Sequence, residues 1–442
     1  MKKIFIALMA TIGLATCAWA QTAYDMNVKL KNGSVFTYAA DDVDEVTFTE
    51  QEVVEDEFNI LTSTYIPDAG LRNYIKDHIA EGASVYTNLQ AKRYRGMISI
   101  NAAQAVSNFK GIEYFVNLDS LKIVSNTTAT SLDISALKNL SFLQLLYCTK
   151  ITEVKIGNIN SLKHLDWTGS NKLNNLNISS DNSATINLVE VGSVDMSNRK
   201  NLEYLDVGGI STIGGVNVVG CENLKYINTY STSIEDIDFT GCNKLEQIYI
   251  HDNKKITSVD VSHLKNTLTV LNLRATNIPG LDVSGFSKLE TLYLQNCKLC
   301  RNVNVTGCES LRIFRTDGSL ISSIDLRDCH KLYEVHVYDD PFLEEFLIGD
   351  CPDLVYLNIF NVPIQSLYLG EMPMLKQLWA YNNSNMVKID ISKVKQVGPY
   401  SYYLDYNEKL SEIKVWSTFD VNNPPEGIYK DDTATYVYEF SE

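Results

Sequence analysis

The sequence predicts a repeat solenoid of the α/β type that is mostly β. We expect a curved coil with a parallel sheet on its concave side, a small helical cap at the N-terminal end and a short β leader. An L-x-x-L-x-L pattern returns every 21 to 23 residues over most of the chain. One such row can bury its leucines only against neighbouring rows, which is how solenoids form a core. The apolar fraction of 45% and the charged fraction of 21% are ordinary for a folded chain.

The repeats extend over residues 118–415 as about 13 to 14 rows. Each clear row continues with seven or eight residues and an apolar–Asp/Asn–apolar triplet, as in LEQIYIHDNKKITSVDVS from Leu245. Rows open at Leu118, Leu140, Leu162, Leu202, Leu224, Leu245, Leu268, Leu289, Leu311, Leu332, Leu354 and Leu375, and a degenerate last row opens near Pro399. Because 40 residues separate Leu162 from Leu202, we expect a worn row at residues 184–197.

The full pattern, L-x-x-L-x-L-x-x-N/C, is that of leucine-rich repeats. The Asn/Cys column holds Asn126, Cys148, Asn253, Cys297, Asn383 and Asn407. Other rows place Ser170, Thr232, Thr276, Ser319 and Asp340 there, and these side chains can also form hydrogen bonds with turn backbone. Ile210 and Val362 cannot, so we expect these two turns to be looser or differently shaped.

The repeat resembles that of internalin-like surface proteins and related bacterial leucine-rich-repeat adhesins, most clearly in its L-D-V-S half-row. Residues 58–117 resemble the helical N-terminal cap of that family, in IPDAGLRNYIKDHI from Ile66 and in the stretch from Ile98. Asn101 and Gln104 predict a capping box on the second cap helix. Some relatives carry an acidic calcium loop in the cap. Here AEGASVYTNLQAKRYRGM lacks spaced carboxylates, so no calcium is expected there.

The two ends of the chain predict export and a closed coil. Residues 1–20 read as a signal peptide that ends in Ala18-Trp19-Ala20; a lipoprotein anchored at Cys17 is the alternative. Residues 21–57 predict a leader with a hairpin turn at Asn32-Gly33 and an acidic linker, similar to a leader in secreted proteins of Gram-negative gut bacteria. Residues 416–442 predict a C-terminal cap with a closing strand. We therefore expect a protein that is secreted or held on the outer cell surface.

The charge of the chain disfavours some partners. The formal net charge is −16, and loss of Lys2 and Lys3 with the signal peptide makes it −18. Such an acidic surface repels nucleic acid, so no DNA or RNA partner is expected. After the first twenty residues no apolar run is long enough to span a bilayer, so no transmembrane segment is expected.

The sequence predicts no catalytic site, metal site or cofactor. His164, His251 and His336 share one strand face, but four rows separate each from the next. At about 4.8 Å per row this is roughly 19 Å, too far for one metal or one catalytic pair. No Ser/His/Asp set, Cys/His set or phosphate loop is recognisable. We therefore expect a binding protein and not an enzyme.

The cysteines are predicted to be free and buried. Cys221, Cys242, Cys308, Cys329 and Cys351 share a column that other rows fill with residues such as Leu137 and Phe286. A column that accepts leucine and phenylalanine is an interior column, and free cysteine behaves as a small hydrophobic residue. Cys300 also falls at an apolar position. The alternative is disulfides between neighbouring rows, because rows about 4.8 Å apart are within reach of a bridge.

A column of aspartates lies in the L-D-V triplets on the other side of the coil. Its members are Asp133, Asp195, Asp238, Asp260, Asp282, Asp325 and Asp390. We expect these carboxylates to face solvent and to accept backbone hydrogen bonds in turns. Cation binding by the stacked carboxylates is the alternative.

The third, fifth and seventh residues of each clear row point away from the core, because side chains alternate along a strand. Of these 39 positions twelve are aromatic, against 10% of the whole chain. Phe142 is one, and the predicted binding residues are the other eleven: Tyr204, Tyr226, Tyr230, Tyr249, Tyr293, Tyr338, Tyr356, Phe360, Trp379, Tyr381 and Tyr403. Tyr and Trp dominate binding surfaces, whereas packing requires no rings there. The alternative is that the rings merely suit strands and stack across rows.

Three functions fit this concave face. The resemblance implies an adhesin-like protein that recognises an extracellular protein of a host or a bacterium. A glycan-binding surface protein is the second, because exposed Tyr and Trp also stack on sugars, and Asn358 and Gln377 near Trp379 could supply polar contacts. A structural surface scaffold is the third.

Overall fold

The structure, a computed structural model, describes residues 25–29, 35–39, 56–156, 161–166, 170, 175–179, 185–187, 193–211, 213–394 and 401–441. The chain forms two compact units, Met1–Asp56 and Glu57–Glu442. In the first unit β1 (Asp25–Lys29) and β2 (Val35–Ala39) pair antiparallel. The expected signal peptide and the Asn32-Gly33 turn lie outside the described residues.

The second unit begins with two short helices, α1 (Ala69–His78) and α2 (Asn88–Arg93). Asp68 caps α1, and a Thr87/Gln90 capping box begins α2. The predicted Asn101/Gln104 capping box is present, but it caps the 3₁₀ turn η2 (Ala102–Gln104) and not an α-helix. The helical expectation for this stretch is therefore wrong. Residues before the box alternate between exposed and buried, as a strand requires, and form β3 (Met97–Asn101). A second 3₁₀ turn, η3 (Ile112–Tyr114), follows.

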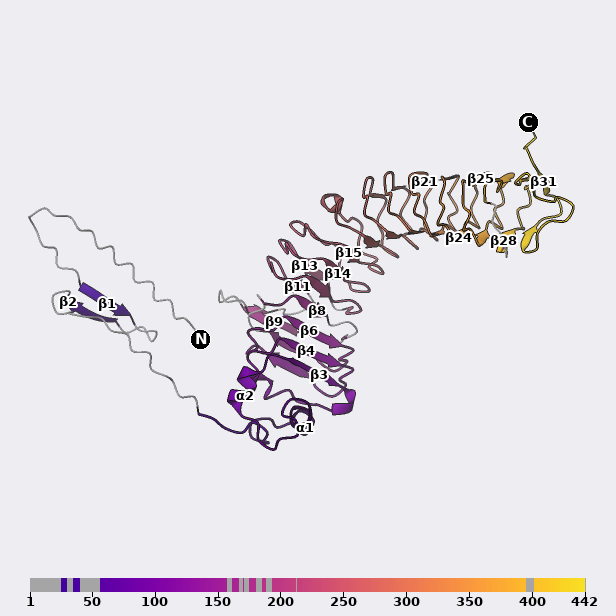
Figure 1. Ribbon diagram of the computed structural model, residues 1–442. Coiled ribbons are helices and arrows are strands. Elements are labelled where there is room, and N and C mark those ends of the chain that lie inside the picture. Colours follow the sequence, from indigo (N-terminus) through magenta and orange to yellow (C-terminus); the bar gives the residue numbers. More distant parts are fainter. Residues whose placement is uncertain are drawn as a thin grey trace, which may run out of the picture. The chain divides into compact units, whose positions relative to one another are not determined.

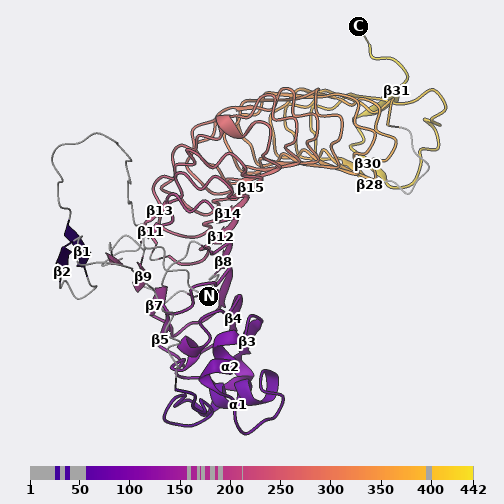
Figure 2. The same ribbon diagram turned by 60° about the vertical axis from the view of Figure 1, so that its left-hand side comes forward.

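A single fifteen-stranded parallel sheet, here called the inner sheet, runs through this unit (Figure 1). After β3 its strands are, in spatial order, β4 (Ser120–Val124), β6 (Phe142–Leu146), β8 (His164–Asp166), β12 (Tyr204–Asp206), β14 (Tyr226–Asn228), β15 (Gln247–Tyr249), β16 (Val270–Asn272), β18 (Thr291–Tyr293), β20 (Ile313–Arg315), β22 (Glu334–His336), β24 (Tyr356–Asn358), β26 (Gln377–Trp379), β28 (Ser401–Leu404) and β30 (Ile428–Lys430). Figure 2 shows β8, β12, β14 and β15 on the inner side of the coil and β11 and β13 on its outer side. The predicted fold class, a mostly-β leucine-rich-repeat solenoid, is confirmed.

Short sheets cover the outer side of the coil. They consist of β5 (Ser131–Ile134), β7 (Glu153–Ile156), β9 (Asn175–Ser179) and β10 (Thr185–Asn187); β11 (Ser193–Asp195) with β13 (Gly215–Asn217); β17 (Leu281–Asp282) with β19 (Val303–Asn304); β21 (Ser323–Leu326) with β23 (Glu345–Ile348); and β25 (Ser366–Tyr368), β27 (Lys388–Asp390), β29 (Glu412–Lys414) and β31 (Thr435–Val437). A 3₁₀ turn, η4 (Ser262–Leu264), takes the place of an outer strand in one row.

The worn row expected at residues 184–197 is wrong. β8 pairs directly with β12, so no strand of the inner sheet lies between them. Among the described residues between β8 and β11, β9 and β10 pair with each other antiparallel. In the repeat register Ser183 stands where the opening leucine of a row would be, so the sequence lacks the leucine that opens other rows.

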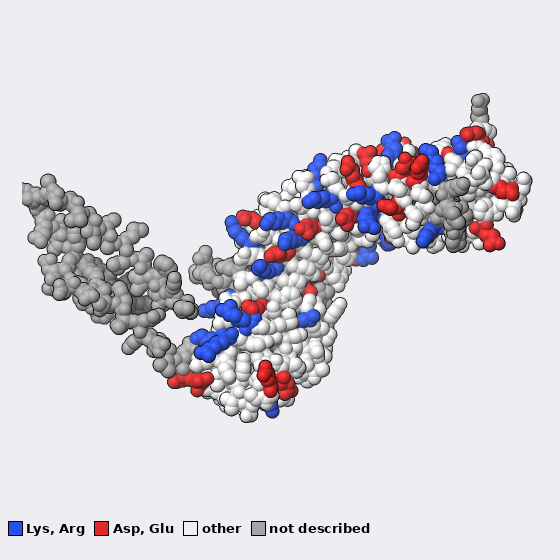
Figure 3. Space-filling view, in the orientation of Figure 1, with Lys and Arg blue, Asp and Glu red and all other residues white. Residues whose placement is uncertain are grey.

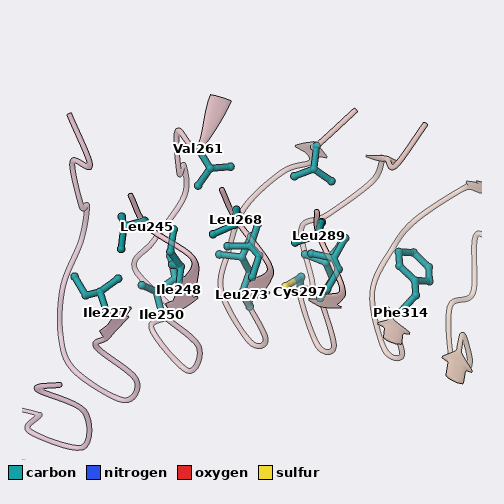
Figure 4. Close-up of a cluster of buried hydrophobic side chains, with 14 of the residues drawn as sticks. Ile227, Leu245, Ile248, Ile250, Val261, Leu268, Leu273, Leu289, Cys297 and Phe314 are labelled. Carbon is teal, nitrogen blue, oxygen red and sulfur yellow. Dashed lines mark hydrogen bonds between the residues drawn. The ribbon is translucent and has the colours of Figure 1, made fainter. Parts of the chain in front are cut away.

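The core is built from the inward residues of the rows (Figure 4). Leu245, Ile248 and Ile250 of one row are fully buried, and the equivalent leucines of the next rows pack against them. Tyr402 takes an equivalent inward position in β28, and its hydroxyl donates to the Leu375 carbonyl at 2.8 Å. Cutting such a side chain to alanine costs about 2–5 kcal/mol.

The predicted free, buried cysteines are confirmed for all eight in the described part of the chain. Thiols of the outer column donate to carbonyls one row back, as from Cys221 to Met196 and from Cys242 to Val218, both at 3.0 Å. Burial raises the pKa of Cys242 to about 12, so this thiol stays protonated and unreactive.

The Asn/Cys column is a ladder of hydrogen bonds between rows. The Asn383 Nδ2 donates to the Ile359 carbonyl at 2.9 Å, and its Oδ1 accepts from the Val362 N–H at 3.0 Å. Each row from β4 to β28 whose residue before the ladder position is described has a left-handed residue there; in the row of β8 this position, 169, lies outside the described residues. Gly209 (φ 76°) and Asn361 (φ 56°) keep this conformation before Ile210 and Val362. The turns at Ile210 and Val362 were expected to be looser or differently shaped, and at residues 209 and 361 this expectation is wrong.

The last coil is closed by aromatic packing. Trp416 and Phe419 are buried with ring centroids 4.9 Å apart, and Tyr436 of β31 contacts Phe419 at 4.8 Å. The residues from 416 onward thus cover the apolar end of the core.

Candidate binding face

The inner sheet presents three columns of outward side chains, which are the third, fifth and seventh residues of each row. The strand register places Tyr204, Tyr226 and Tyr356 in the first column, Tyr249, Tyr293, Trp379 and Tyr403 in the second, and Tyr230, Tyr338, Phe360 and Tyr381 in the third. All eleven predicted residues therefore lie on one face. Ten are half-buried, and only Tyr403 is exposed, at 38%. The rings are less exposed than expected because rings of neighbouring rows cover one another.

Rings of the first column form a face-to-face stack, here called the N-terminal ring stack. Phe142, His164, Tyr204 and Tyr226 follow one another with centroid distances of 4.2, 4.0 and 4.2 Å and interplanar angles of 14° or less. Tyr249 continues it at 5.4 Å with a tilted ring. Burial and the charge of Asp206 raise the pKa of both Tyr204 and Tyr226, so both hydroxyls stay protonated.

Beside this stack lie two buried carboxylates that the sequence analysis did not single out. Asp166 and Asp206 are Cα partners on β8 and β12 and are only 6% and 5% exposed. The Gln144 side chain donates to Asp166 and the Asn228 side chain to Asp206, each at 2.9 Å. The sequence could have revealed these two aspartates, because both occupy the second column, next to the rings of the first column. Burial lowers the pKa of His164, against the opposing effect of Asp166, so this imidazole is neutral near pH 7.

The third column holds two further ring groups. Tyr338, Phe360 and Tyr381 stack at 4.4 and 4.6 Å with interplanar angles of 5° and 9°. Tyr230 stacks on His251 at 5.2 Å. A Cβ on Gly208 would lie 2.2 Å from the Tyr230 ring, so the glycine leaves room for it.

A polar network occupies the middle of the C-terminal half of the face. Arg315 pairs with Glu334, and the His336 imidazole lies 3.3 Å from the same carboxylate. The Asn358 amide lies 3.1 Å from His336 Nε2 and accepts from Gln377 at 2.8 Å. Asn358 and Gln377, expected as polar partners for a ligand near Trp379, thus already bond to one another.

Tyr293 and Tyr356 border this network. The Arg315 guanidinium lies 5.8 Å from the Tyr293 ring centroid, and Tyr356 contacts Tyr333 edge-to-face at 5.7 Å. Burial, followed by the charge of Arg315, lowers the pKa of His336, which keeps its imidazole neutral near pH 7.

The C-terminal end of the face carries three exposed rings. Trp379 meets Tyr403 edge-to-face at 6.2 Å, and Tyr403 stacks on Tyr429 at 5.0 Å. Tyr403, Tyr406 and Tyr429 are 38%, 69% and 50% exposed, and we call these three the C-terminal tyrosine patch. Sequence reasoning missed Tyr406 and Tyr429. Tyr429 could have been found, because IYK pairs with YYL in β28 and continues the second column.

The carboxylates of the aspartate column on the outer side form hydrogen bonds within turns. Each of its seven carboxylates accepts the backbone N–H of the residue two positions on, at 2.8 to 3.1 Å, as the sequence predicted. In the described part of the chain, no group of three or more His, Cys, Asp or Glu side chains is placed to hold a metal ion. His164, His251 and His336 lie in three different clusters of the face.

Comparison with known proteins gives similar folds only. No protein-family model matches the chain, and no curated protein matches it.

No helix among the described residues is long and apolar enough to cross a membrane.

Many solved structures are similar to the chain, among them these three. The functional domain of InlJ from Listeria monocytogenes, described as including a cysteine ladder, has a TM-score of 0.45 and 14% identity over 77% of this chain and 78% of that one. The internalin InlF from Listeria monocytogenes gives 0.38 and 14% over 85% and 98%. TLR13 in complex with ssRNA13 gives 0.37 and 15% over 77% and 56%. By its own rows, inner sheet and Asn/Cys ladder, the chain is a leucine-rich-repeat solenoid, and internalins are among its solved structural neighbours.

Proposed function

We propose that this chain is a secreted or cell-surface binding protein that recognises an extracellular protein through the ring-bearing face of its inner sheet. The observation that carries the proposal is that all eleven predicted rings lie on this one face, in three aligned columns. Aromatic side chains give large contact areas at low entropic cost, and they are enriched at the centres of protein interfaces.

The stacking of the rings favours a protein over a glycan as the partner. Sugars bind aromatic side chains by lying against the flat face of a ring. In the N-terminal ring stack and in the Tyr338–Phe360–Tyr381 stack, neighbouring rings at 4.0 to 4.6 Å already cover those faces. What remains accessible is ring edges and tyrosine hydroxyls, which suit the mixed polar and apolar contacts of a protein surface.

A purely structural role explains the stacks but not the C-terminal tyrosine patch. Stacked rings in neighbouring strands stabilise a sheet, and the half-buried stacks fit this function. Tyr406 and Tyr429, at 69% and 50% exposed, bury little surface within the chain. We therefore place the strongest partner contacts at the C-terminal end of the face.

Screening tests the proposal directly. The mature chain, residues 21–442, is screened against panels of extracellular proteins and of glycans. Affinity for any ligand found is then measured for Trp379→Ala and Tyr381→Ala. We expect each to lose about 2 kcal/mol or more of binding, because a few large anchors carry most interface energy. If these two variants lose affinity for a glycan but bind every protein ligand as the parent chain does, the preference for a protein partner is refuted.

Two control variants interpret the result. Tyr368→Ala removes a ring that is 52% exposed, but on β25 in an outer sheet, and should bind normally. Leu378→Ala removes a fully buried leucine and should lose about 2–5 kcal/mol of stability. If Trp379→Ala and Tyr381→Ala also bind normally, the rings serve sheet packing only.

Secretion is tested separately by the intact mass of the protein from its native host. We expect a mature N-terminus at Gln21, after the A-x-A site. A species that begins at Cys17 and carries acyl mass would instead show an anchored lipoprotein.

A further inference from the structure

The outward side chains at the C-terminal end of the inner sheet are aromatic, acidic or neutral. Strands β24, β26, β28 and β30 present Tyr356, Asn358, Phe360, Gln377, Trp379, Tyr381, Ser401, Tyr403, Asp405 and Tyr429 on this face. No lysine or arginine is among these described side chains. Lys430 follows Tyr429, but it pairs with the buried Leu404, and its ammonium donates to the carbonyls of Asp431 and Ala434 at 3.2 and 2.6 Å.

Tyr406 lies at the rim of this surface in a conformation that costs free energy. Its φ of 57° is left-handed, and the equivalent positions of other rows hold Gly, Asn, Asp, Ser or Ala, except in the row of β6, where Tyr147 has a φ of 53° and is 55% exposed. Bulky residues in this region are strained, and such strain gathers at functional sites. The Asp431 carboxylate fixes the turn by accepting the N–H groups of Tyr406 and Asn407 at 2.9 and 2.7 Å. The strained ring is nevertheless 69% exposed, so packing does not explain it.

Negative charge surrounds these rings. Asp405 is the third-column residue beside Tyr403, and Asp431 holds the backbone of Tyr406. Burial, followed by the charges of Asp339 and Asp405, raises the pKa of the Tyr381 hydroxyl, so this ring stays uncharged. In the view of Figure 3, the charged side chains at the C-terminal tip of the coil are acidic, whereas basic and acidic side chains are interspersed along the rest of it.

We propose that the C-terminal tyrosine patch, with Asp405, binds a cationic segment of a protein partner, one rich in arginine or lysine. Tyr429 is the last ring of its stack on the last strand of the inner sheet and is 50% exposed, which leaves ring surface for a guanidinium or ammonium. A cation over a tyrosine ring is attracted by the ring quadrupole, and a nearby carboxylate supplies the counter-charge. This inference rests on the proposed function and names the partner chemistry of the same face.

Three peptides of equal length, with Arg-Ser, Gln-Ser or Glu-Ser repeats, test the proposal by fluorescence anisotropy with the mature chain. We expect only the arginine peptide to bind, and we expect its affinity to fall as salt is raised, because surface charges are screened. Binding of the glutamine peptide with equal affinity would overturn the proposal.

Variants locate the site. Tyr429→Ala and Asp405→Asn should each weaken arginine-peptide binding by about tenfold, with unchanged melting temperature. Tyr368→Ala and Asp282→Asn are matched controls on the outer sheets and should bind as the parent chain does. Full binding by both patch variants would assign the peptide to another acidic surface and overturn the proposal.

The two proposals fail in different ways. A screened protein partner that depends on Trp379 and Tyr381, but not on Asp405 or on salt, would leave the proposed function intact and refute the cationic segment. Arginine-peptide binding that depends on Tyr429 and Asp405, with no screened protein partner that depends on Trp379 or Tyr381, would support the cationic segment and refute the proposed function.

Discussion

Asp340 is the one carboxylate in the Asn/Cys ladder, and its replacement by asparagine should stabilise the protein. It is fully buried and accepts hydrogen bonds from the Thr316 hydroxyl at 3.1 Å and from the N–H and hydroxyl of Ser319 at 2.6 and 2.9 Å. Burial raises its pKa from 3.8 to about 7, against the opposing effect of these hydrogen bonds. The repeat pattern assigns Asp340 to the Asn/Cys column, but it does not show that burial raises the pKa of this carboxyl.

The magnitude follows from proton linkage. Because the folded-state pKa lies above the unfolded value, the folded chain binds more protons than the unfolded chain between about pH 4 and 7. The free energy of unfolding therefore falls as pH rises through that window. A difference of about 3 pKa units corresponds to about 4 kcal/mol. In Asp340→Asn the new Nδ2 can donate to the Thr316 carbonyl, as the Asn383 Nδ2 does to Ile359 one row back.

We expect Asp340→Asn to gain up to about 4 kcal/mol at pH 8 and almost nothing at pH 4, where the native carboxyl is protonated. Denaturant melts at several pH values measure this, and hydrogen exchange of the Ser319 amide reports the same row locally. Asp325→Asn is the control of opposite sign, because bonding to Arg327 lowers the pKa of Asp325. If Asp340→Asn is less stable than the parent at every pH, Asp340 is bound as an anion and the reasoning fails.

Three further predictions concern the coil. Ala275→Gly should stabilise by about 0.5–1 kcal/mol, because φ is 55° there and the relief of strain exceeds the added chain entropy; a lower melting temperature would contradict this. Phe360→Ala should cost about 1–3 kcal/mol of unfolding free energy, more than Tyr403→Ala, because Phe360 lies between two stacked rings; equal losses would argue against stacking. Thiol titration of the mature chain without reductant should find eight groups after denaturation and few before it; recovery of two to four would show disulfides.

Most of the fold was predictable because the period of the repeat determines it. The opening leucines located every clear row, and the same alignment showed that Cys221 shares a column with Leu137, which predicted a buried thiol. The aspartate turns followed from the same register. The Asn101/Gln104 box was found correctly, but a capping pattern does not reveal how long a helix continues. The one row expected between Leu162 and Leu202 is wrong because spacing alone counts residues and does not show whether a strand joins the inner sheet.

The face was predictable in outline and not in detail. Strand alternation placed all eleven rings on one side of the inner sheet. It could not show that Tyr204 and Tyr226 would lie 4.2 Å apart with covered faces, since ring orientation depends on neighbours one row away. Nor could it show that Asn358 and Gln377 bond to each other. These contacts join rows separated by about twenty residues in sequence.

The direct pairing of β8 with β12 has a consequence for how the solenoid unfolds. On the outer side, β9 and β10 belong with β7, whereas β11 belongs with β13, so the outer sheets are divided here, as they also are after β13, β19 and β23, while the inner sheet is continuous. In a solenoid, stability is a sum of row and nearest-neighbour terms, and a weak junction divides the chain into separate cooperative blocks. His164 and Tyr204, stacked at 4.0 Å, span this junction. The N-terminal ring stack thus couples the two blocks mechanically, and its loss should turn one unfolding transition into two.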